Sequence, residues 1–452
     1  MNLRKSRLYV YSLPDRVIFN GAMNYTYKQI GLINFPVMMS ILMEQLINIT
    51  DAVFLGHVGE VALGASAIAG IYYLAIYMLG FGFSIGLQVM IARRNGEQDY
   101  PETGKTFFQG LFFLLGLAIS LCLLIRVVSP FILRQLIASP EIFQASVQYL
   151  EWRSFGLLFS FPFLAIRAFF VGITHTKALS WAAFGAVAIN IPLNYFLIFS
   201  LDFGISGAAI ASSLAEMGSL GVLLFYVGIK VNKKKYGLKL VYDGKLLVKV
   251  LNLSVWSMLH AFISVAPWFL FFVAIEHVGQ TELAISNITR SVSTLFFVIA
   301  NSFAVTTGSL VSNAIGAGTS HQLFPICRKV LVLGYAIGLP WVGLALCVNS
   351  RIVGFYTDSE VLIRQAYIPF IVMLLNYIFA LPGYVYLNAV GGTGKTKITF
   401  LFQMTTTVIY LVYLYGLSFY AQTSLAVYLT AEYLFVILLG VQSIVYLKRK
   451  HY

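Results

Sequence analysis

A series of long apolar segments that recurs along almost the whole chain constrains the fold more than any other feature. A segment of at least ~18 apolar residues is long enough to cross a bilayer as a helix. Twelve such segments lie near residues 29–55, 61–92, 106–126, 142–170, 178–200, 204–229, 250–275, 283–314, 324–348, 360–390, 397–420 and 423–447. Hydrophobic residues make up 59% of the 452 residues and charged residues only 10%, a composition that excludes a soluble domain of this length. We therefore predict an all-α polytopic membrane protein with twelve transmembrane helices.

The distribution of Lys and Arg predicts which side of the membrane each connection faces. Most of the 30 basic residues fall at the two ends and in the even-numbered connections, above all in residues 230–249, whereas the odd-numbered connections hold only Arg126, Arg134 and Arg351. Because cytoplasmic loops carry the excess of basic residues, we expect both termini in the cytoplasm. The same rule explains the net charge of +13 without a nucleic-acid partner.

The N-terminal segment carries no pattern of a removable signal peptide. Residues 1–28 contain several basic side chains but no apolar core followed by a small-residue cleavage site. The first span is therefore expected to act as the insertion signal. We expect a multi-pass protein of the plasma membrane, which would be the inner membrane in a Gram-negative cell.

The two halves of the chain repeat at an offset of 220 residues. The segment from His57 to Glu60 recurs as His277 to Gln280, and the same register matches Gly96 with Gly316, Pro162 with Pro382 and Gly172 with Gly392. With six spans in each copy, the copies are parallel repeats, and a cavity between them is expected. The predicted domains are a cytoplasmic segment 1–28, an N-terminal six-helix lobe 29–230, a basic cytoplasmic linker 231–249, a C-terminal six-helix lobe 250–447 and a tail 448–452.

The first span carries two carboxylates in an otherwise apolar segment. Glu44 and Asp51 are about two helical turns apart, with Asn48 between them on the same face. A charge in hydrocarbon costs at least a few kcal/mol, so this face must turn toward the bundle interior or a watery cavity. Such residues are typical of an ion or substrate path.

Polar residues of two further spans can meet this face. Asn190 and Asn194 lie at i and i+4 around Pro192, and Ser212, Glu216 and Ser219 share one stripe of the next span. Together with the acids they could build a polar pocket inside one lobe that holds a proton or surrounds a cation with oxygen atoms. The alternative is that the amides and hydroxyls only hydrogen-bond neighbouring helices, a role that does not require the carboxylate of Asp51. Ion binding there would change the charge and packing of the lobe.

At the 220-residue offset the second lobe does not copy these acids. Asp51 corresponds to Phe271, Glu44 to Ser264, and Asn190 and Asn194 to Tyr410 and Leu414. Its candidate cavity residues are His260 and Trp268, which follow helical spacing in the seventh span, together with Arg290, Asn376 and Glu432. Arg290 is costly in a membrane unless it is paired, and Glu276 and Glu282 are candidate partners; Glu432 stands as an isolated acid. Arg153 and Arg167 lie near span ends, where the default expectation is that they reach toward the headgroups.

No known catalytic motif appears in the sequence. The three cysteines, Cys122, Cys327 and Cys347, are single residues in apolar runs without the spacing of a disulfide framework or a metal site. We predict that the protein is not an enzyme and has no cofactor. No metal site is expected apart from a candidate Na⁺ position near Asp51.

Several of these segments together resemble the MATE (multidrug and toxic compound extrusion) transporters. They are Pro36 with Glu44-Gln45 and the run from Asp51 to Gly59, the segment from Asn190 to Asn194, the segment from Gly204 to Ser212, and the turns Ala92 to Gly96 and Asn313 to Gly318. The resemblance covers essentially the whole chain. It implies two bundles around a V-shaped cleft and export of organic, often cationic, compounds in exchange for H⁺ or Na⁺.

The resemblance also assigns residues. The family's coupling aspartate falls on Asp51, its span 5 asparagine on Asn190 and its span 6 hydroxyl on Ser212, while Glu44 stands where a glutamine is common. Asn194 stands where one branch has a second aspartate, and His260 and Asn376 lie in the regions where another branch carries acids. The expected ion-coupling residues are Asp51, Glu44, Asn190, Asn194 and Ser212; the expected substrate-cavity residues are Gln45, Asn48, Glu216, His260, Trp268, Arg290, Asn376 and Glu432.

The sequence thus predicts a monomeric antiporter that exports small organic cations, contacts membrane lipid and alternates access between two lobes. The alternative is a flippase for a lipid-linked saccharide from the same wider superfamily. An anionic pyrophosphate headgroup would require a cavity rich in Arg or Lys. The acids at positions 44, 51, 216 and 432 favour a cationic or neutral cargo instead.

Overall fold

The structure is a computed structural model, and it describes residues 18–19, 22–23, 25–137, 139–276, 279–354, 360–418 and 424–450. Within these ranges the backbone alone is described at residues 18, 19, 22, 23, 60, 136, 268, 269, 272, 273, 276, 280, 283, 284, 287 and 418. Twelve helices of the described part are long and apolar enough to cross a membrane. The twelve predicted spans are therefore confirmed.

The first six spans form an N-terminal lobe, which comprises helices α1 to α7. Their bounds are α1 Tyr27–Val58, α2 Glu60–Gly96, α3 Tyr100–Leu136, α4 Pro140–Arg153, α5 Leu157–Gly172, α6 Lys177–Tyr195 and α7 Gly204–Lys230. Helices α4 and α5 make one span with a 3-10 turn, Ser154–Gly156, between them. A short π-helical stretch, Phe196–Ser200, ends the fifth span. Before α1, a two-residue hairpin pairs β1 Ile18–Phe19 with β2 Ala22–Met23.

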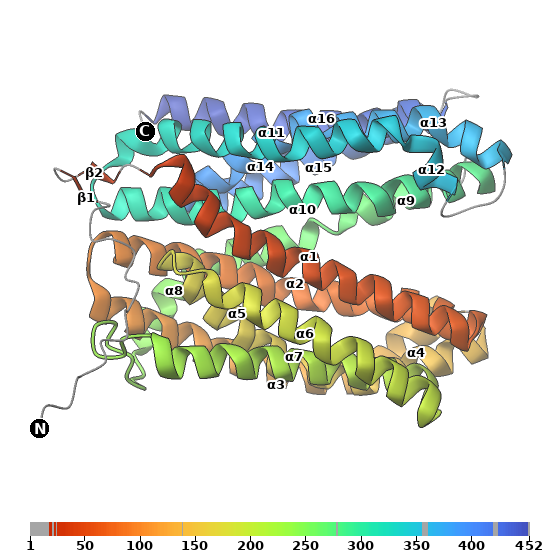
Figure 1. The fold of residues 1–452 in the computed structure, drawn as a ribbon, viewed down its shortest axis with the longest axis horizontal. Helices are drawn as coiled ribbons and strands as arrows, with labels where there is room; N and C mark the ends of the chain where they lie inside the picture. Colours follow the sequence, from red (N-terminus) through yellow and green to blue (C-terminus); the bar gives the residue numbers. More distant parts are fainter. Residues whose placement is uncertain are drawn as a thin grey trace, which may run out of the picture.

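The last six spans form the C-terminal lobe, which comprises helices α8 to α16. Their bounds are α8 Gly244–Ile263, α9 Ala266–Glu276, α10 Gln280–Gly316, α11 Leu323–Cys347, α12 Asn349–Gly354, α13 Glu360–Leu375, α14 Tyr377–Gly392, α15 Thr396–Ser418 and α16 Leu425–Arg449. A 3-10 turn, Ser320–Gln322, precedes α11. The two lobes lie one above the other in Figure 1, with α10 and α11 above α2, and α1 crosses in front of α10 from the upper left to the lower lobe at the right.

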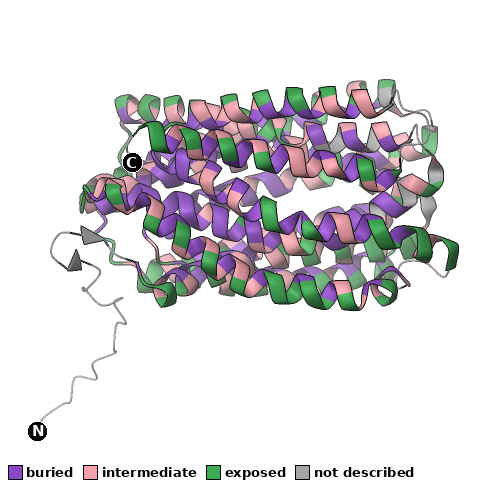
Figure 2. Cartoon of the chain, turned by 90° about the horizontal axis from the view of Figure 1, so that it is seen from above, coloured by how far each residue is buried: buried purple, intermediate pink, exposed green. Residues whose placement is uncertain are grey.

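The outer surface of both lobes is apolar. Large hydrophobic side chains such as Phe131, Trp181, Phe225 and Val412 are exposed on it. Figure 2 shows the buried residues gathered where helices face one another and the exposed residues on the outward helix faces. A surface of this kind suits hydrocarbon, where each helix satisfies its own backbone hydrogen bonds.

The repeat is visible in matched contacts. Thr176 donates its hydroxyl to the carbonyl oxygen of Ile33 at 2.8 Å, and Thr396 donates to that of Leu253 at 2.6 Å, each pair displaced by 220 residues from the other. The left-handed turn positions match as well: Gln98 has φ 60° and its counterpart Gly318 has φ 73°. The prediction of two pseudo-symmetric six-helix bundles is therefore confirmed.

The connection between the lobes begins as a loop and turns into a helix earlier than the sequence suggests. Residues 244–249, predicted as linker, form the first turns of α8, because Asp243 caps this helix by accepting from the backbone N–H groups of Lys245 and Leu246. The preceding loop packs on α3, where Gln109 donates to the carbonyl oxygen of Val241 at 2.7 Å. Burial, with Tyr100 adjacent, raises the pKa of Tyr236 in this loop to about 12.

The lobes join at the end of the molecule where α1 begins and α16 ends. Helix α1 contacts α10, α2 contacts α8, and α2 crosses α10. At the crossing, a Cβ built on Gly96 would lie 2.0 Å from the carbonyl oxygen of Asn313, and one on Gly316 would lie 2.1 Å from that of Arg93. These two contacts are again related by the 220-residue offset. Only glycine allows the helix ends to approach so closely.

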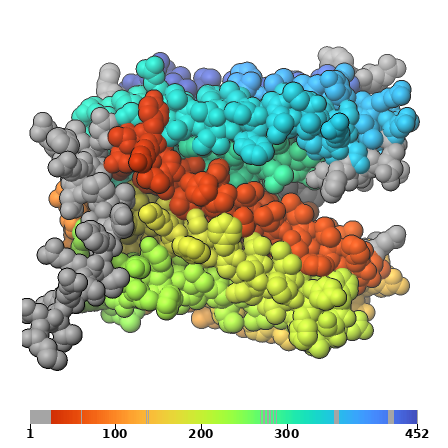
Figure 3. Space-filling view, viewed as in Figure 1, coloured from red at the N-terminus to blue at the C-terminus, as the bar shows by residue number. Residues whose placement is uncertain are grey.

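Side-chain hydrogen bonds surround this crossing. Asn95 donates to the amide oxygen of Asn313 at 2.7 Å, Ser312 donates to the carbonyl oxygen of Val89 at 2.6 Å, and Arg93 donates to that of Thr393 at 2.6 Å. Figure 3 shows the molecule hollowed between the lobes at the opposite end. The lobes are thus closed at one end and open at the other.

Substituting Gly96 by Val should open the closed end. Overpacking at such a contact costs about 1–3 kcal/mol, so the lobes are expected to separate there part of the time. The three native cysteines are replaced by Ser, and a single cysteine is placed at Ser309. The measurement is the rate at which a membrane-impermeant maleimide labels this cysteine. Gly116→Val is the matched control, because nothing lies within 4 Å of a Cβ at that position. Equal labelling in both variants would contradict the assigned role of the crossing.

Candidate functional site

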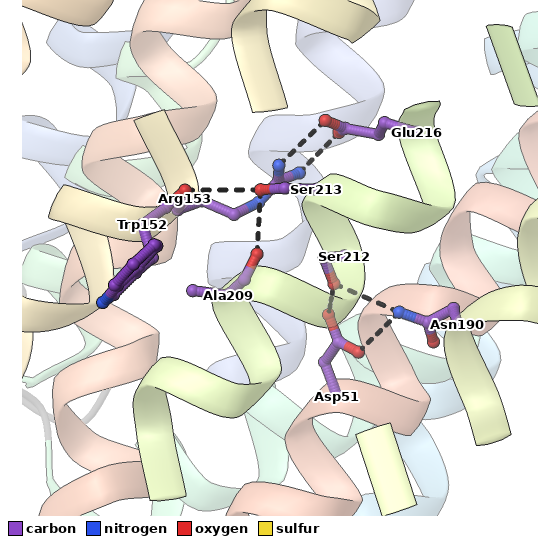
Figure 4. Close-up of polar contacts among 8 residues, drawn as sticks. All are labelled: Asp51, Trp152, Arg153, Asn190, Ala209, Ser212, Ser213 and Glu216. Atoms are coloured by element: carbon purple, nitrogen blue, oxygen red, sulfur yellow. Dashed lines mark hydrogen bonds and ion pairs between the residues drawn. The ribbon is translucent and has the colours of Figure 1, made fainter. Parts of the chain in front are cut away.

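Asp51 lies in α1 and is held by side chains of α6 and α7. Its Oδ1 accepts from the amide nitrogens of Asn190 at 3.2 Å and Asn194 at 2.6 Å, and its Oδ2 accepts from the hydroxyl of Ser212 at 2.5 Å. Figure 4 shows Asp51 between Ser212 and Asn190. Asp51 and the three residues that the sequence grouped with it, Asn190 and Asn194 from one span and Ser212 from the next, therefore meet in one hydrogen-bonded cluster.

Local sequence places these donors. Asn190 and Asn194 lie one turn apart on α6, so both amides face α1. Pro192 between them has no N–H to give to the carbonyl one turn earlier, which loosens the helix at this level. The amides and Ser212 also bond one another: Asn190 donates to Ser212 at 3.1 Å, and Asn194 donates to the amide oxygen of Asn190 at 3.1 Å.

One acceptor of the cluster has no donor. The amide oxygen of Asn194 is buried and makes no hydrogen bond with any described residue. A buried oxygen without a partner beside a carboxylate is costly. Rotation of the Asn190 and Asn194 amides would turn their two oxygens toward Asp51. These oxygens, together with the carboxylate of Asp51 and the hydroxyl of Ser212, would form the set of oxygen ligands that a hard cation prefers.

Asp51 and Ser212 of the cluster form part of the wall of a cavity of about 420 Å³ inside the N-terminal lobe. The two polar stripes that the sequence identified both face it, Glu44, Asn48 and Asp51 from α1 and Ser212, Glu216 and Ser219 from α7. Tyr73, Tyr77 and Tyr149 add aromatic rings to the wall. The polar pocket predicted within one lobe is thus present.

Glu216 is not a free acid of this cavity, because it pairs with Arg153. The guanidinium makes two parallel hydrogen bonds to the carboxylate, at 2.9 and 2.6 Å, and lies 4.2 Å from the ring centre of Tyr73. The expectation that Arg153 reaches toward the headgroups is wrong, since its side chain lines the cavity. Gly156 leaves room for the pair: a Cβ there would lie 2.1 Å from Arg153 and 2.4 Å from Glu216.

Glu44 differs from the other acids. It faces the cavity and has neither a hydrogen bond nor an ion pair with the described residues. Arg167 of α5 is buried, with its guanidinium 5.5 Å from the ring centre of Phe81. The headgroup expectation for Arg167 is therefore also wrong.

The other predicted cavity residues lie elsewhere. Gln45, on the first span, does not line this cavity, and neither do His260, Arg290, Asn376 and Glu432 of the C-terminal lobe. The side chain of Trp268 lies outside the described residues. Because the seventh span breaks after Ile263, Trp268 stands on α9, separate from the helix that carries His260.

Arg290 and Glu432 pair with each other within the C-terminal lobe. Arg290 Nη2 lies 3.4 Å from Glu432 Oε1. Glu432 is thus not the isolated acid that the sequence suggested, and it is a partner of Arg290 that the sequence did not identify. No group of three or more His, Cys, Asp or Glu side chains in the described residues could hold a metal ion.

Comparison with known proteins identifies relatives that match segments of both lobes. A model of the MatE family matches residues 36–196 and 257–416. "Probable multidrug resistance protein NorM" of Photorhabdus laumondii is 22% identical over 77% of this chain and 78% of its own length. "Multidrug resistance protein NorM" of Vibrio cholerae is 21% identical over 73% of this chain and 74% of its own.

Solved structures share the fold. A "MATE in the straight conformation" superposes with a TM-score of 0.87 at 17% identity, covering 94% of this chain and 96% of that one. A MOP superfamily transporter from Pyrococcus furiosus gives a TM-score of 0.85 at 18% identity, covering 94% and 95%.

Breaking the pair of Arg153 and Glu216 should destabilise the N-terminal lobe. Removing one partner of a buried ion pair costs about 3–5 kcal/mol, and the low end applies here because the two side chains are 13% and 24% exposed. Arg153→Met is expected to lower the apparent unfolding temperature in detergent by several degrees, and Arg153→Met with Glu216→Gln by less. Lys105→Met, which breaks a surface pair with Glu102, is the control and should cost at most about 1 kcal/mol. Similar shifts for the Arg153 and Lys105 variants would argue against a buried pair.

Proposed function

The chain belongs to the MatE family of transporters, and from this premise we propose that it exports small organic cations in exchange for inward H⁺ or Na⁺. The family resemblance predicted from the sequence is confirmed by the match to both lobes. Family members are transporters and not enzymes. Relatives named as multidrug resistance proteins support organic compounds of several kinds as cargo.

The cluster around Asp51 carries the proposal for coupling. A carboxylate is retained in the interior of a membrane helix bundle, and five side-chain oxygens of Asp51, Asn190, Asn194 and Ser212 lie within one hydrogen-bonded group. A proton would convert Asp51 into a donor and displace one of the amide N–H groups. A sodium ion would instead turn the amide oxygens toward itself. Either event rearranges the contact of α1 with α6 and α7.

Helix α1 can transmit that rearrangement to the other lobe. Its first turns are tied to α10, because the amide group of Asn34 donates to Ser302 at 3.3 Å and accepts from Thr306 at 2.9 Å. Asp51 lies on the same helix beyond Pro36, where a backbone hydrogen bond is missing and bending costs little. Ion capture at Asp51 would therefore bend or shift α1 against the lobe junction and favour one of the two orientations of the lobes.

The cavity beside this cluster suits a cationic cargo. Asp51, Glu44 and Glu216 face it, and Arg153 compensates only the last of them. The tyrosine rings of its wall can stack on a flat cation. A pyrophosphate headgroup would meet these carboxylates, so the flippase alternative finds no support in this cavity.

We place the protein in the plasma membrane, or the inner membrane of a Gram-negative cell, as a monomer with both termini in the cytoplasm. The basic connections lie at the end where α1 begins and α16 ends, and the positive-inside rule assigns such connections to the cytoplasm. The hollow between the lobes then faces outward. The proposed domains are the lobe 29–230 and the lobe that ends at residue 447 and, because α8 begins at Gly244, starts six residues before the predicted 250; residues 231–243 join them.

Asp51→Asn is expected to abolish export while the protein still folds and inserts. The amide has the size of the carboxylate but cannot take up a proton or neutralise a cation. The measurement is dye efflux from proteoliposomes with independently imposed pH and Na⁺ gradients. Asp202→Asn is the control, because Asp202 is exposed in a turn with φ 54° that Asn also adopts readily. Gradient-driven efflux that persists in Asp51→Asn would remove Asp51 from the mechanism.

Glu44→Gln should weaken recognition of cationic cargo without removing coupling. We expect the KM for a permanently charged organic cation to rise about tenfold, which corresponds to roughly 1.4 kcal/mol, and the KM for a neutral compound to change little. Gln45→Ala, at the neighbouring position that does not line the cavity, is the matched control. An equal effect on charged and neutral cargo would show that Glu44 only shapes the cavity.

A further inference from the structure

The C-terminal lobe has a counterpart of the Asp51 cluster, built from different residues. At the 220-residue offset, Asp51, Asn190 and Ser212 correspond to Phe271, Tyr410 and Glu432. The helices involved begin within one residue of this offset, α6 at Lys177 and α15 at Thr396, and α7 at Gly204 and α16 at Leu425. The equivalent positions of the two lobes can therefore be compared.

The counterpart residues also meet in space. Tyr410 donates its hydroxyl to Glu432 Oε1 at 3.0 Å, and Arg290 Nη2 donates to the same oxygen at 3.4 Å. The guanidinium of Arg290 lies 5.0 Å from the ring centre of Phe271. The carboxylate is thus on the last span of the C-terminal repeat, whereas it is on the first span of the N-terminal repeat. The equivalent positions form a cluster in both lobes.

Arg290 is the addition that the N-terminal lobe lacks. Its counterpart there is Gly70, which lines the cavity and has no atom within 4 Å of a Cβ position. The guanidinium of Arg290 thus extends from a position that, in the N-terminal lobe, opens onto the cavity lined by Asp51. The C-terminal lobe therefore has the fixed positive charge of Arg290 at the position where the N-terminal lobe has Gly70 and an open cavity wall.

Arg290 and Glu432 form a buried ion pair within this C-terminal cluster. The side chains of Arg290 and Glu432 are only 8% and 14% exposed, so the pair attracts strongly and is weakly screened. Among the described residues, Arg290 of α10 and Tyr410 of α15 are titratable groups that hydrogen-bond to Glu432. The tyrosine supplies no charge near neutral pH.

We propose that the guanidinium of Arg290 occupies, in the C-terminal lobe, the place that a coupling ion takes beside Asp51 in the N-terminal lobe. Glu432 is thereby neutralised by the chain itself, and this lobe takes up neither a proton nor Na⁺. The inference rests on the proposed function for its comparison with Asp51. It implies that ion binding reshapes only the N-terminal lobe and that the C-terminal lobe acts as the static half.

The test uses the purified full-length protein in detergent and an Asp51→Asn background, which isolates the C-terminal lobe. Protonation is read from the carboxylic-acid band in pH-difference infrared spectra, and cation binding from retained radioactive Na⁺. We expect no ion signal that depends on Glu432 while Arg290 is present. Adding Arg290→Met should produce the binding of one further proton or Na⁺ per protein, and adding Glu432→Gln to that chain should remove it. Arg290→Lys keeps the positive charge and should produce no additional binding.

Two results would overturn the inference. One is a folded Arg290→Met chain without a new ion signal; the other is loss of an ion equivalent when Glu432→Gln is made with Arg290 in place. The second comparison needs no Arg290 variant, so it decides the question even if Arg290→Met fails to fold. If Asp51→Asn keeps the ion uptake of the unmodified chain, the proposed coupling at Asp51 is wrong. The comparisons that vary Glu432 still show whether the C-terminal lobe binds an ion.

Discussion

The organisation of the N-terminal lobe depends on one carboxylate that has to be kept out of lipid. Asp51 is stabilised there because three side chains from two other helices donate to it. Each donor comes from a segment that is otherwise apolar, so the hydrogen bonds also fix how α1, α6 and α7 face one another. The carboxylate faces a cavity inside the lobe, so it does not have to face hydrocarbon.

The two lobes share a backbone arrangement and differ in chemistry. Matched hydrogen bonds, such as those of Thr176 and Thr396, and matched glycine contacts at Gly96 and Gly316 preserve the helix positions. Within this common frame, one lobe leaves Glu44 and Asp51 facing a cavity, whereas the other pairs Glu432 with Arg290. A repeated scaffold with unequal charges provides a physical basis for a transporter in which one half responds to ions and the other supports it.

Helix α1 connects the site to the lobe junction. Asn34 ties its beginning to α10, Pro36 removes a backbone hydrogen bond, and Asp51 lies near its other end. The junction itself is tightly packed through glycines and buried side-chain hydrogen bonds. A dense contact of this kind has few intermediate arrangements, so a small change in α1 can favour one discrete orientation of the lobes over another.

The sequence by itself determined the twelve spans, the two-lobe repeat and the polar stripe of Glu44, Asn48 and Asp51, because hydrophobicity and helical periodicity are local properties of the chain. It also grouped Asn190, Asn194 and Ser212 with Asp51, through the family resemblance. Only the tertiary structure decided the partners of the charged residues: Arg153 pairs with Glu216, and Arg290 pairs with Glu432 across 142 residues of chain. Such pairing depends on which helix faces meet and at what depth, and neither the spacing along the chain nor the polarity of a single span contains that information.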